Sequence, residues 1–230
     1  MLRRKNDKII SDLFPENIIT TFFDKSYTDD PEKILSDFSA DYLIQMQQTH
    51  SINIKEIRDR PTNKITTVKN TDAVITNLKR CILIVKTADC LPVLYSDGDF
   101  IAVSHQGWKG SLENMAGKLL NRLKNLGSDP KKIKVAFGPH IGDCCYNIPK
   151  DRENLFSEKY PEWKKKIFRK ESEKTYLNLG LLNFLQVKET GVPVDNIDFF
   201  PFCTSCDKRY FSFRRDKGIK GSNISLVFKK

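Results

Sequence analysis

The stretch TADCLPVLYSDGDFIAVSHQGWKG, residues 87–110, places two short apolar runs on either side of a turn signal. The residues Ser96-Asp97-Gly98-Asp99 between LPVLY and FIAVS are typical of a tight turn, so the pattern predicts a β-hairpin over residues 91–104. Cys90 precedes one strand and His105 follows its antiparallel partner. We therefore expect both side chains at the same open end of the hairpin, within reach of a common ligand.

The rest of the chain favours a sheet-rich fold around this hairpin. Short apolar runs typical of strands are YLIQM, INIKEI, DAVIT and CILIVK before it, and KIKVAFG, NIDFF and ISLVF after it. The first forty residues look irregular, with short strands. Strands interrupted by isolated helices indicate an α+β fold, not a regular βαβ repeat. Because no linker or repeat divides the sequence, we expect a single domain over residues 1–230.

The clearest helical pattern follows the hairpin directly. In SLENMAGKLLNRLKNLG, apolar residues recur at spacings of three and four, which predicts one helix with Ser111 as N-cap and Gly127 as stop. Its first turn would follow His105 closely and leave backbone N–H groups available to an anion. A second, mostly helical pattern covers residues 176–190 and ends at Gly191.

The composition narrows the classes of partner. The 230 residues carry 39 basic and 29 acidic side chains, and a net charge of +10 is compatible with an anionic partner without choosing among nucleic acid, membrane surface and a phosphorylated metabolite. The basic residues are spread along the chain, so solvated surface is the favoured interpretation of most of them. Aromatic residues do not alternate with the basic runs, and no helix-turn-helix or finger spacing accompanies them, so nucleic acid is not expected. No apolar run approaches the ~20 residues that cross a bilayer. The N-terminal MLRRKNDKIISDLF lacks the apolar core of a signal peptide.

We therefore expect no membrane partner and a cytoplasmic location. In that compartment the six cysteines are more often thiols, metal ligands or nucleophiles than disulfides. The CxxC at residues 203–206 could join the adjacent cysteines 144–145 in a four-thiolate structural zinc site. Ordinary reduced thiols are the favoured interpretation, because adjacent cysteines are poor tetrahedral partners.

The three histidines all lie in segments that look functional: His50 in QQTHS, His105 in SHQGWKG and His140 in GPHIGDCC. Two histidines and a thiolate are good zinc ligands, and three protein ligands leave a fourth tetrahedral position for water or substrate. Cys90 with His50 and His105 is therefore a candidate catalytic zinc site. The HxE and PCxxC signature of zinc nucleobase deaminases is absent, and so is HExxH.

Other residues have both a structural and a functional interpretation. Asp89 beside Cys90 either caps a turn or acts as a carboxylate that orients a ligand histidine or serves as general acid/base. Arg214 and Arg215 either form a solvated pair or bind phosphate or carboxylate. Without a metal, Cys90 as nucleophile and His105 as its base would suit a cysteine hydrolase or amidase.

Taken together, the motifs resemble those of the YfiH-like family, whose members have long been labelled multicopper polyphenol oxidoreductases or laccase-like proteins. The motifs are QMQQTH, TADCLPVLYSD, IAVSHQGWKG, GPHIGDCCYNI and CTSCDKRYFSFRRDKG, in that order. The resemblance covers residues 40 to 220 and implies packed mixed β-sheets flanked by helices. It also implies one zinc ion per chain, held by residues that correspond to His50, Cys90 and His105.

The family resemblance implies a purine nucleoside phosphorylase that acts on adenosine, inosine, guanosine and methylthioadenosine with phosphate, and that also deaminates adenosine. On this interpretation Cys90, His105 and Asp89 are the catalytic candidates. Lys109, Arg214 and Arg215 are expected to bind phosphate. The oligomeric state is left open.

The sequence departs from the family pattern in places. Lys109-Gly110 stands where the family commonly has Arg-Gly, and His140 stands where a small residue is usual, so His140 is not expected to be a ligand. A laccase needs a blue copper and a three-copper cluster, which use far more histidines than the three present, so copper is not expected. The remaining alternatives are the cysteine hydrolase, a polyphenol oxidase as the label suggests, and a non-enzymatic zinc-stabilised binding module.

Overall fold

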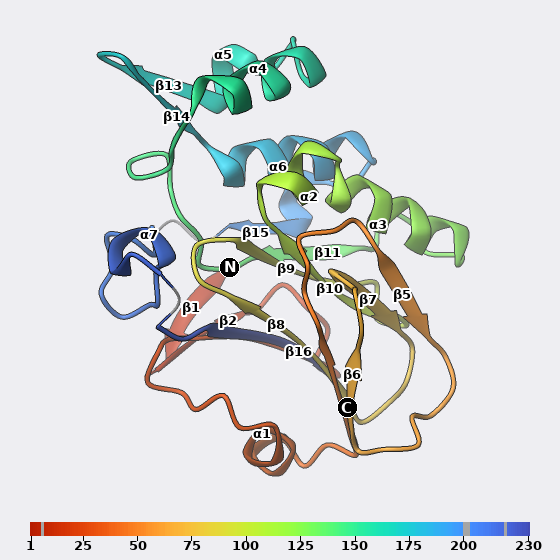
Figure 1. Cartoon of the computed structure of the whole chain (residues 1–230). Helices are drawn as coiled ribbons and strands as arrows, with labels where there is room; N and C mark the ends of the chain where they lie inside the picture. Colours follow the sequence, from red (N-terminus) through yellow and green to blue (C-terminus); the bar gives the residue numbers. More distant parts are fainter. Residues whose placement is uncertain (6, 200–202, 219) are drawn as a thin grey trace.

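The computed structural model describes residues 1–5, 7–199, 203–218 and 220–230. In these ranges two large β-sheets pack face to face, and helices cover the outer side of each (Figure 1). The layers run from α1 (Pro31–Phe38) through both sheets to α3 (Met115–Asn125) and α6 (Leu179–Glu189). Both sheets mix parallel and antiparallel pairs, so the predicted α+β class with packed mixed sheets and flanking helices is confirmed.

The first sheet contains strands from both ends of the described chain. Its order is β1 (Leu2–Lys5), β2 (Lys8–Ser11), β3 (Ile18–Phe23), β16 (Asn223–Lys229), β8 (Cys81–Thr87), β4 (Tyr42–Met46) and β6 (Ile65–Val68). β4 runs parallel to β8 and β6, and the other neighbours are antiparallel. The last strand of the chain therefore lies at the centre of this sheet.

The second sheet has the predicted hairpin at its centre. Its order is β15 (Ile197–Phe199), β11 (Lys134–Phe137), β9 (Leu91–Ser96), β10 (Ile101–Gln106), β7 (Ala73–Thr76) and β5 (Ile54–Ile57). Every residue of β9 and β10 is buried, because one face meets the first sheet and the other meets the helices. Burial on both faces explains why the runs LPVLY and IAV in these strands are apolar without polar alternation.

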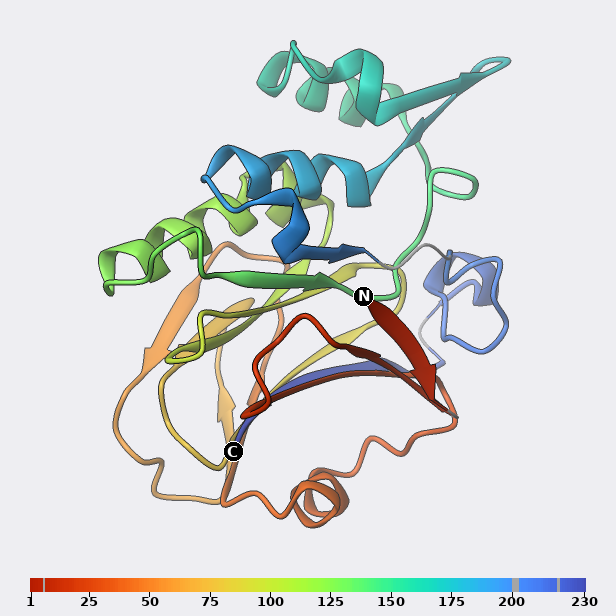
Figure 2. The same ribbon diagram turned by 180° about the vertical axis from the view of Figure 1, so that it is seen from behind.

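Three apolar clusters hold the layers together. The cluster between the sheets includes Phe22, Val85, Leu94 and Val103. The cluster between the second sheet and the helices includes Tyr95, Leu119 and Leu182. The cluster under α1 includes Ile34, Leu226 and Phe228. The view from behind shows the same succession of layers, with α1 beneath the first sheet (Figure 2).

A smaller part of the chain stands above the helical layer in Figure 1. It contains a three-stranded sheet in the order β12 (Asn147–Ile148), β14 (Lys174–Leu177) and β13 (Phe168–Glu171), together with α4 (Lys150–Lys159) and α5 (Lys164–Ile167). The remaining elements of the described ranges are three short helices: α2 (Trp108–Leu112), the 3₁₀ helix η1 (Val194–Asn196) and α7 (Phe213–Asp216).

The hairpin prediction is confirmed, with one difference in position. β9 and β10 pair antiparallel with Leu94 opposite Val103 and Pro92 opposite His105, and Gly98 has a φ of 97° in the turn. His105 thus lies inside β10, where we expected it to follow the strand. Cys90, just before β9, is still at the same end of the hairpin.

The helix after the hairpin differs from the prediction. It is interrupted, so that α2 starts at Trp108 and α3 starts only at Met115. Ser111 is not an N-cap, because it is fully buried inside α2. Asn114 at a φ of 57° caps α3 instead, with its Oδ1 accepting from Gly117 N at 2.9 Å. An asparagine tolerates this left-handed backbone, which breaks the helix where apolar spacing alone predicts continuity.

Other boundaries also differ from the sequence-based expectations. The first forty residues include α1, whose start is marked by Asp30 accepting from the next turn and by a proline at its first position. Residues 176–177 belong to β14 and not to the following helix. The predicted strand NIDFF is β15 over Ile197–Phe199, and its last residue, Phe200, lies outside the described residues.

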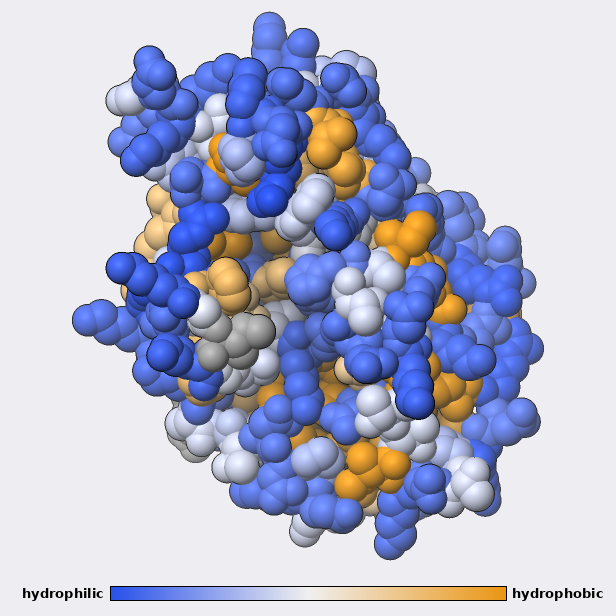
Figure 3. Space-filling view, in the orientation of Figure 1, coloured by the Kyte–Doolittle hydropathy of each residue, from blue (hydrophilic) through white to orange (hydrophobic). Residues whose placement is uncertain are grey.

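None of the helices in the described ranges has the length and apolar character needed to cross a membrane. On the face seen in Figure 3, hydrophilic side chains predominate and apolar ones form separate small patches.

Candidate metal centre and cavity

Three side chains that could bind a metal converge at the open end of the β9–β10 hairpin. Cys90 lies just before β9, His105 lies near the end of β10, and His50 comes from the segment between β4 and β5. Their ligand atoms all lie within 4.8 Å of one another, and Cys90 Sγ is 3.7 Å from His50 Nε2. The fold therefore brings together the three residues that the sequence singled out as zinc ligands.

Asp72, directly before β7, positions both histidines. His105 Nδ1–H donates to Asp72 Oδ1 at 2.7 Å, which leaves Nε2 as the ring nitrogen available to a metal. The backbone N–H of His50 donates to the same oxygen at 3.1 Å, and Ser51 N donates to Oδ2 at 2.7 Å. These bonds hold His50 at a φ of 58°, a left-handed conformation that few residues other than glycine adopt.

The electrostatics of the cluster favour a thiolate. Burial alone would raise the pKa of the Cys90 thiol, but the neighbouring His105 and His50 outweigh it and lower that pKa to about 6. Burial alone would lower the pKa of His105, yet Cys90 and the hydrogen bond to Asp72 raise it to about 9. Burial alone would raise the pKa of Asp72, but the hydrogen bonds from His105 and Ser51 hold it well below its usual range.

Gly107 allows the close approach on which the cluster depends. A Cβ at this position would lie 2.6 Å from His50 Cδ2 and 3.4 Å from Cys90 Sγ. Any side chain would therefore displace the His50 ring. The glycine of the HQGW segment is required here because the backbone passes directly beside two of the three ligands.

The cluster lies in one wall of a cavity of about 600 Å³. The other walls carry aromatic rings and two guanidinium groups, and they include Trp108, Tyr146, Phe213, Arg152, Arg214 and Leu179. The Arg152 guanidinium lies 4.3 Å from the centroid of the Trp108 ring, and that of Arg214 lies 5.7 Å from the centroid of the Tyr146 ring. The volume falls within the range of about 300–1,000 Å³ that is usual for small-molecule sites.

Asp89 also lines this cavity, but hydrogen bonds from the protein occupy both of its carboxylate oxygens. Oδ1 accepts from Thr204 Oγ1 at 2.6 Å, and Oδ2 accepts from Ser212 Oγ at 3.0 Å and from Arg214 N at 2.7 Å. Asp89 has a φ of 85°, and these bonds hold that strained backbone in place. The arrangement favours a positioning role for Asp89, and its role in proton transfer stays a prediction.

The three predicted phosphate-binding residues lie in different places. Arg214 lines the cavity, where its guanidinium also donates to Cys145 O at 2.9 Å. Lys109 lies beside a neighbouring surface hollow, with Nζ 5.7 Å from the centroid of the Trp108 ring. Arg215 pairs with Asp216 at 2.9 Å and lines a separate hollow. Of the three, Arg214 therefore lines the same cavity as His50, Cys90 and His105.

Sequence reasoning missed three residues of this site: Asp72, Arg152 and Tyr146. Asp72 stands directly before the run AVIT, but only the pairing of β7 with β10 shows that it faces His105. Tyr146 directly follows the GPHIGDCC segment, and this position in a motif is only a weak indication that its ring lines the cavity. Arg152 lies on α4, in a region where no motif marked it.

His140 is not part of the cluster, as expected from the sequence. Its Nδ1–H donates to Gly138 O at 2.8 Å, and its ring packs edge-on against Phe199 with the centroids 5.6 Å apart. Burial lowers the pKa of His140, so the buried ring is neutral. The ring therefore packs the segment after β11 against Phe199 of β15.

The residues present fit a metal ion. Two imidazoles and a thiolate are a donor set that zinc accepts, and a carboxylate bonded to the far nitrogen of a ligand histidine is the usual support for such a site. The set would also accept copper, so the donors do not identify the ion.

Comparison with known proteins finds curated relatives of this chain. A purine nucleoside phosphorylase of Corynebacterium glutamicum is 31% identical over 213 residues, which cover 87% of this chain and 83% of that protein. Adenosine deaminase RL5, from an unknown prokaryotic organism, is 26% identical over 199 residues, which cover 83% of this chain and 76% of that protein.

Solved structures share the fold. YlmD of Geobacillus stearothermophilus has a TM-score of 0.89 at 21% identity, covering 100% of this chain and 98% of that one. The YfiH protein of Bacillus licheniformis also has a TM-score of 0.89, at 22% identity, with coverage of 100% and 99%. Residues 30–230 match the family described as multi-copper polyphenol oxidoreductase laccase, and the chain belongs to this family.

Proposed function

We propose that this chain is a zinc-dependent purine nucleoside phosphorylase that also deaminates adenosine. The observation that carries the proposal is the cluster of His50, Cys90 and His105 in the wall of a cavity that also holds two guanidinium groups and several aromatic rings. The names of the relatives in Corynebacterium glutamicum and of adenosine deaminase RL5 support the two reactions.

The cavity offers the contacts that a purine nucleoside needs. A purine is a flat aromatic group, and Trp108, Tyr146 and Phe213 present rings along the cavity walls. Stacking of a base on an aromatic side chain contributes about 1–3 kcal/mol. The preferred nucleoside among adenosine, inosine, guanosine and methylthioadenosine depends on contacts to groups on the base and the sugar.

Phosphate would be held by guanidinium groups. Arg152 and Arg214 both line the cavity, and guanidinium groups bind phosphate oxygens through two parallel N–H bonds. Lys109 and Arg215 lie outside the cavity lining, so we assign the anion chiefly to Arg152 and Arg214. The chain's net charge of +10 would attract the same anion over a longer range.

The chain's own residues prepare the reacting groups. Asp72 fixes the His105 ring and the His50 backbone, so that two imidazoles and the Cys90 thiolate face one point. A zinc ion held there would polarise an oxygen in its fourth position. The cavity walls would orient phosphate and nucleoside relative to that point, and such positioning supplies a large share of the rate of a two-substrate reaction.

Asp89 would act mainly through its neighbours. Its hydrogen bonds to Thr204, Ser212 and Arg214 N fix the segment that brings Phe213 and Arg214 to the cavity. A general acid/base role for Asp89 would require one of these bonds to be given up during the reaction.

A cysteine hydrolase is the second candidate, and one observation favours it. Cys90, His105 and Asp72 form a chain of nucleophile, base and orienting carboxylate, with the pKa of Cys90 lowered to about 6. His50 distinguishes the two proposals. It is a required ligand for zinc, whereas a pair of Cys90 and His105 can act without it.

The family description names copper, but the donors in this chain are too few for a laccase. With three histidines in the whole sequence, the copper sites of a multicopper oxidase cannot be built. We therefore propose zinc as the resident ion. We also propose that the protein works in the cytoplasm, where its cysteines stay reduced.

Product analysis tests the proposed function. Adenosine and methylthioadenosine are incubated with the protein with and without phosphate, and free base and sugar 1-phosphate are measured. We expect both products only when phosphate is present. Base release that does not depend on phosphate would make the enzyme a hydrolase, and no turnover of any nucleoside would refute the proposal.

A matched pair of variants tests the phosphate site. Arg152→Ala removes a guanidinium from the cavity, whereas Arg122→Ala removes one from α3 that pairs with Glu56 outside the cavity. We expect the first change to raise the KM for phosphate and the second to leave it unchanged.

A further inference from the structure

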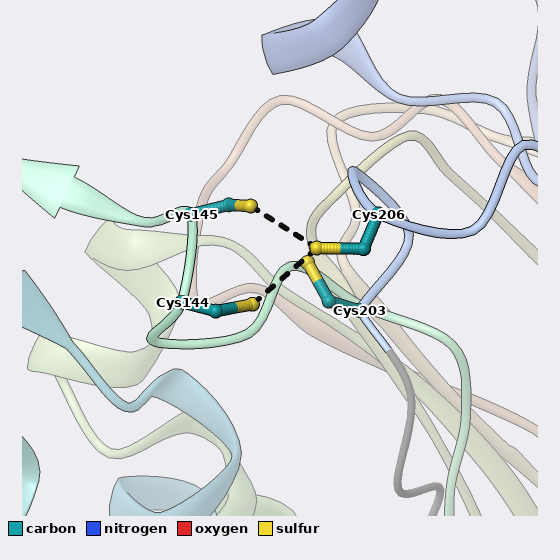
Figure 4. A group of neighbouring side chains, drawn as sticks. All are labelled: Cys144, Cys145, Cys203 and Cys206. Carbon is teal, nitrogen blue, oxygen red and sulfur yellow. Dashed lines mark hydrogen bonds between the residues drawn. The ribbon is translucent and has the colours of Figure 1, made fainter.

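Four cysteines outside the catalytic cluster bring their thiols together (Figure 4). Cys144 and Cys145 come from the segment before β12, and Cys203 and Cys206 come from the segment before α7. All four sulfur atoms lie within 4.8 Å of one another. Cys206 Sγ lies 3.6 Å from Cys144 Sγ and 3.4 Å from Cys145 Sγ.

These separations match a tetrahedral metal site. Four sulfurs at the Zn–S distance of about 2.3 Å stand about 3.8 Å apart at the corners of a tetrahedron. The sulfur atoms of a disulfide are only about 2.05 Å apart, far closer than the pairs observed here. The spacing therefore leaves room for an ion between the sulfurs, and all four cysteines are free.

The two loops turn their cysteines inward in different ways. Tyr146 N and Cys145 N both donate to Gly142 O, at 2.9 and 3.0 Å, and this tight turn sets the neighbouring thiols of Cys144 and Cys145 toward the same point. Adjacent cysteines usually point in different directions and make poor tetrahedral partners, but this turn lets both thiols face the same point. In the CxxC loop, Asp207 N and Cys206 N donate to Cys203 O at 2.9 and 3.2 Å.

The surroundings hold the two loops against each other. Thr204 N donates to His140 O at 3.0 Å, which joins the loops through their backbones. A Cβ at Gly142 would lie 3.2 Å from Cys203 Cβ and 3.3 Å from Cys144 Sγ, so the backbone passes close beside the sulfurs and a side chain there would press on both loops. The thiols are thus fixed by the fold from both sides.

We propose that these four cysteines bind a second zinc ion, which has a structural role. Its ligands would be the thiolates of Cys144, Cys145, Cys203 and Cys206, and binding would release the protons of the thiols. Four thiolates close the coordination shell, so no position is left for substrate. The ion would join the loop that precedes Tyr146 to the loop that precedes Arg214, and both residues line the cavity.

The charges near the cluster suit this assignment. A zinc ion with four thiolates carries a net charge of about −2. Arg214 Nη1 donates to Cys145 O at 2.9 Å, and Arg215 Nη1 donates to Thr204 O at 2.8 Å. Each thiol-bearing loop thus has a guanidinium bound to its main chain. Arg215, which lies away from the cavity lining, thus holds the main chain of the CxxC loop.

Zinc content measured on the full chain and three variants tests the proposal. We expect two zinc ions per wild-type chain, one for each cluster. Cys90→Ala should keep the zinc of the four-cysteine site, and Cys206→Ser should keep only the zinc of the catalytic cluster. Cys81→Ala, which removes a buried thiol of β8 outside both clusters, should keep both ions.

The outcomes for the two sites are separable. A Cys90→Ala protein without zinc would overturn the proposal, and so would a Cys206→Ser protein with as much zinc as the wild type. The proposed activity has no part in either readout. If Cys206→Ser does not fold, X-ray absorption at the zinc edge of Cys90→Ala decides: sulfur neighbours alone at about 2.3 Å support the site, and nitrogen neighbours overturn it.

Mass spectrometry under non-reducing conditions distinguishes zinc-bound thiols from disulfides between the two loops. Zinc-bound thiols are modified by an alkylating reagent only after a chelator is added, and the intact mass shows no loss of hydrogen. A mass lower by two hydrogens for each pair would mean that the loops are joined by disulfides, which would overturn the proposal. We also expect the chelator to lower the melting temperature of Cys90→Ala by several degrees, because a structural ion stabilises the folded chain.

Discussion

Replacement of Asp72 by asparagine tests how the cluster is held. The carboxylate accepts from His105 Nδ1 at 2.7 Å, from His50 N at 3.1 Å and from Ser51 N at 2.7 Å, and it is fully buried. An asparagine has one acceptor oxygen fewer, and its NH₂ group would face N–H groups of the protein that are themselves donors. The side chain at position 72 would therefore lose its negative charge and could no longer accept all the hydrogen bonds that orient His105 and the His50 backbone.

The magnitude follows from these contacts. Removing a carboxylate that supports a ligand histidine lowers metal affinity by about 10–100-fold, which corresponds to about 1.4–2.7 kcal/mol. At least two buried donors lose their acceptor, and each such loss costs about 1–3 kcal/mol of folding stability. We therefore expect Asp72→Asn to lower the free energy of unfolding by about 2–5 kcal/mol.

Asp89→Asn is the matched control. Asp89 is also a buried carboxylate with three donors, but none of the donors is a histidine. It should lose stability on a similar scale while the catalytic zinc affinity changes by less than about threefold. Zinc affinity is measured by competition with a chelator, and stability by urea unfolding. The reasoning is refuted if Asp72→Asn keeps the wild-type zinc affinity, or if Asp89→Asn loses as much affinity as Asp72→Asn.

Three further predictions follow from the same geometry. Gly107→Ala should lose the catalytic zinc, as measured by elemental analysis, because its Cβ would lie 2.6 Å from His50 Cδ2; unchanged zinc would contradict the close approach. Because the pKa of Cys90 is lowered to about 6, the thiolate is present above that pH and is protonated as the pH falls through it. In a chelator competition the zinc affinity of the His50, Cys90 and His105 site should therefore fall more steeply with pH below about pH 6 than above it, and an unchanged slope through that pH would count against a thiolate ligand. Arg152→Gln should raise the KM for phosphate by about tenfold without changing zinc content, because the guanidinium is a phosphate ligand and its contact with Trp108 is not a metal contact.

Local patterns predicted the parts of the fold that depend on local residues. The β9–β10 hairpin follows from two apolar runs and a turn, and it alone places Cys90 and His105 at one end. The layered α+β class follows from the order of strands and helices. Donor chemistry already made His50 the third candidate ligand, and the resemblance of five ordered motifs pointed to the same residue.

The remaining features depend on contacts between distant segments. Asp72 and His105 are 33 residues apart and meet only because β7 pairs with β10. The break between α2 and α3 depends on a left-handed Asn114, which apolar periodicity does not reveal. The four-cysteine cluster needs a turn at residues 142–146 that points adjacent thiols in the same direction. Arg215 does not reach the cavity because its guanidinium binds Asp216 and the carbonyl of Thr204.

The central claim is that nucleoside cleavage depends on a metal ion held by three side chains. Phosphate-dependent release of adenine from adenosine by His50→Ala tests it most directly. If zinc is required, this variant should lose the catalytic zinc and its turnover together, as Cys90→Ala should. If His50→Ala keeps its turnover while Cys90→Ala loses it, the active group is the thiol–imidazole pair of Cys90 and His105, and the claim is contradicted.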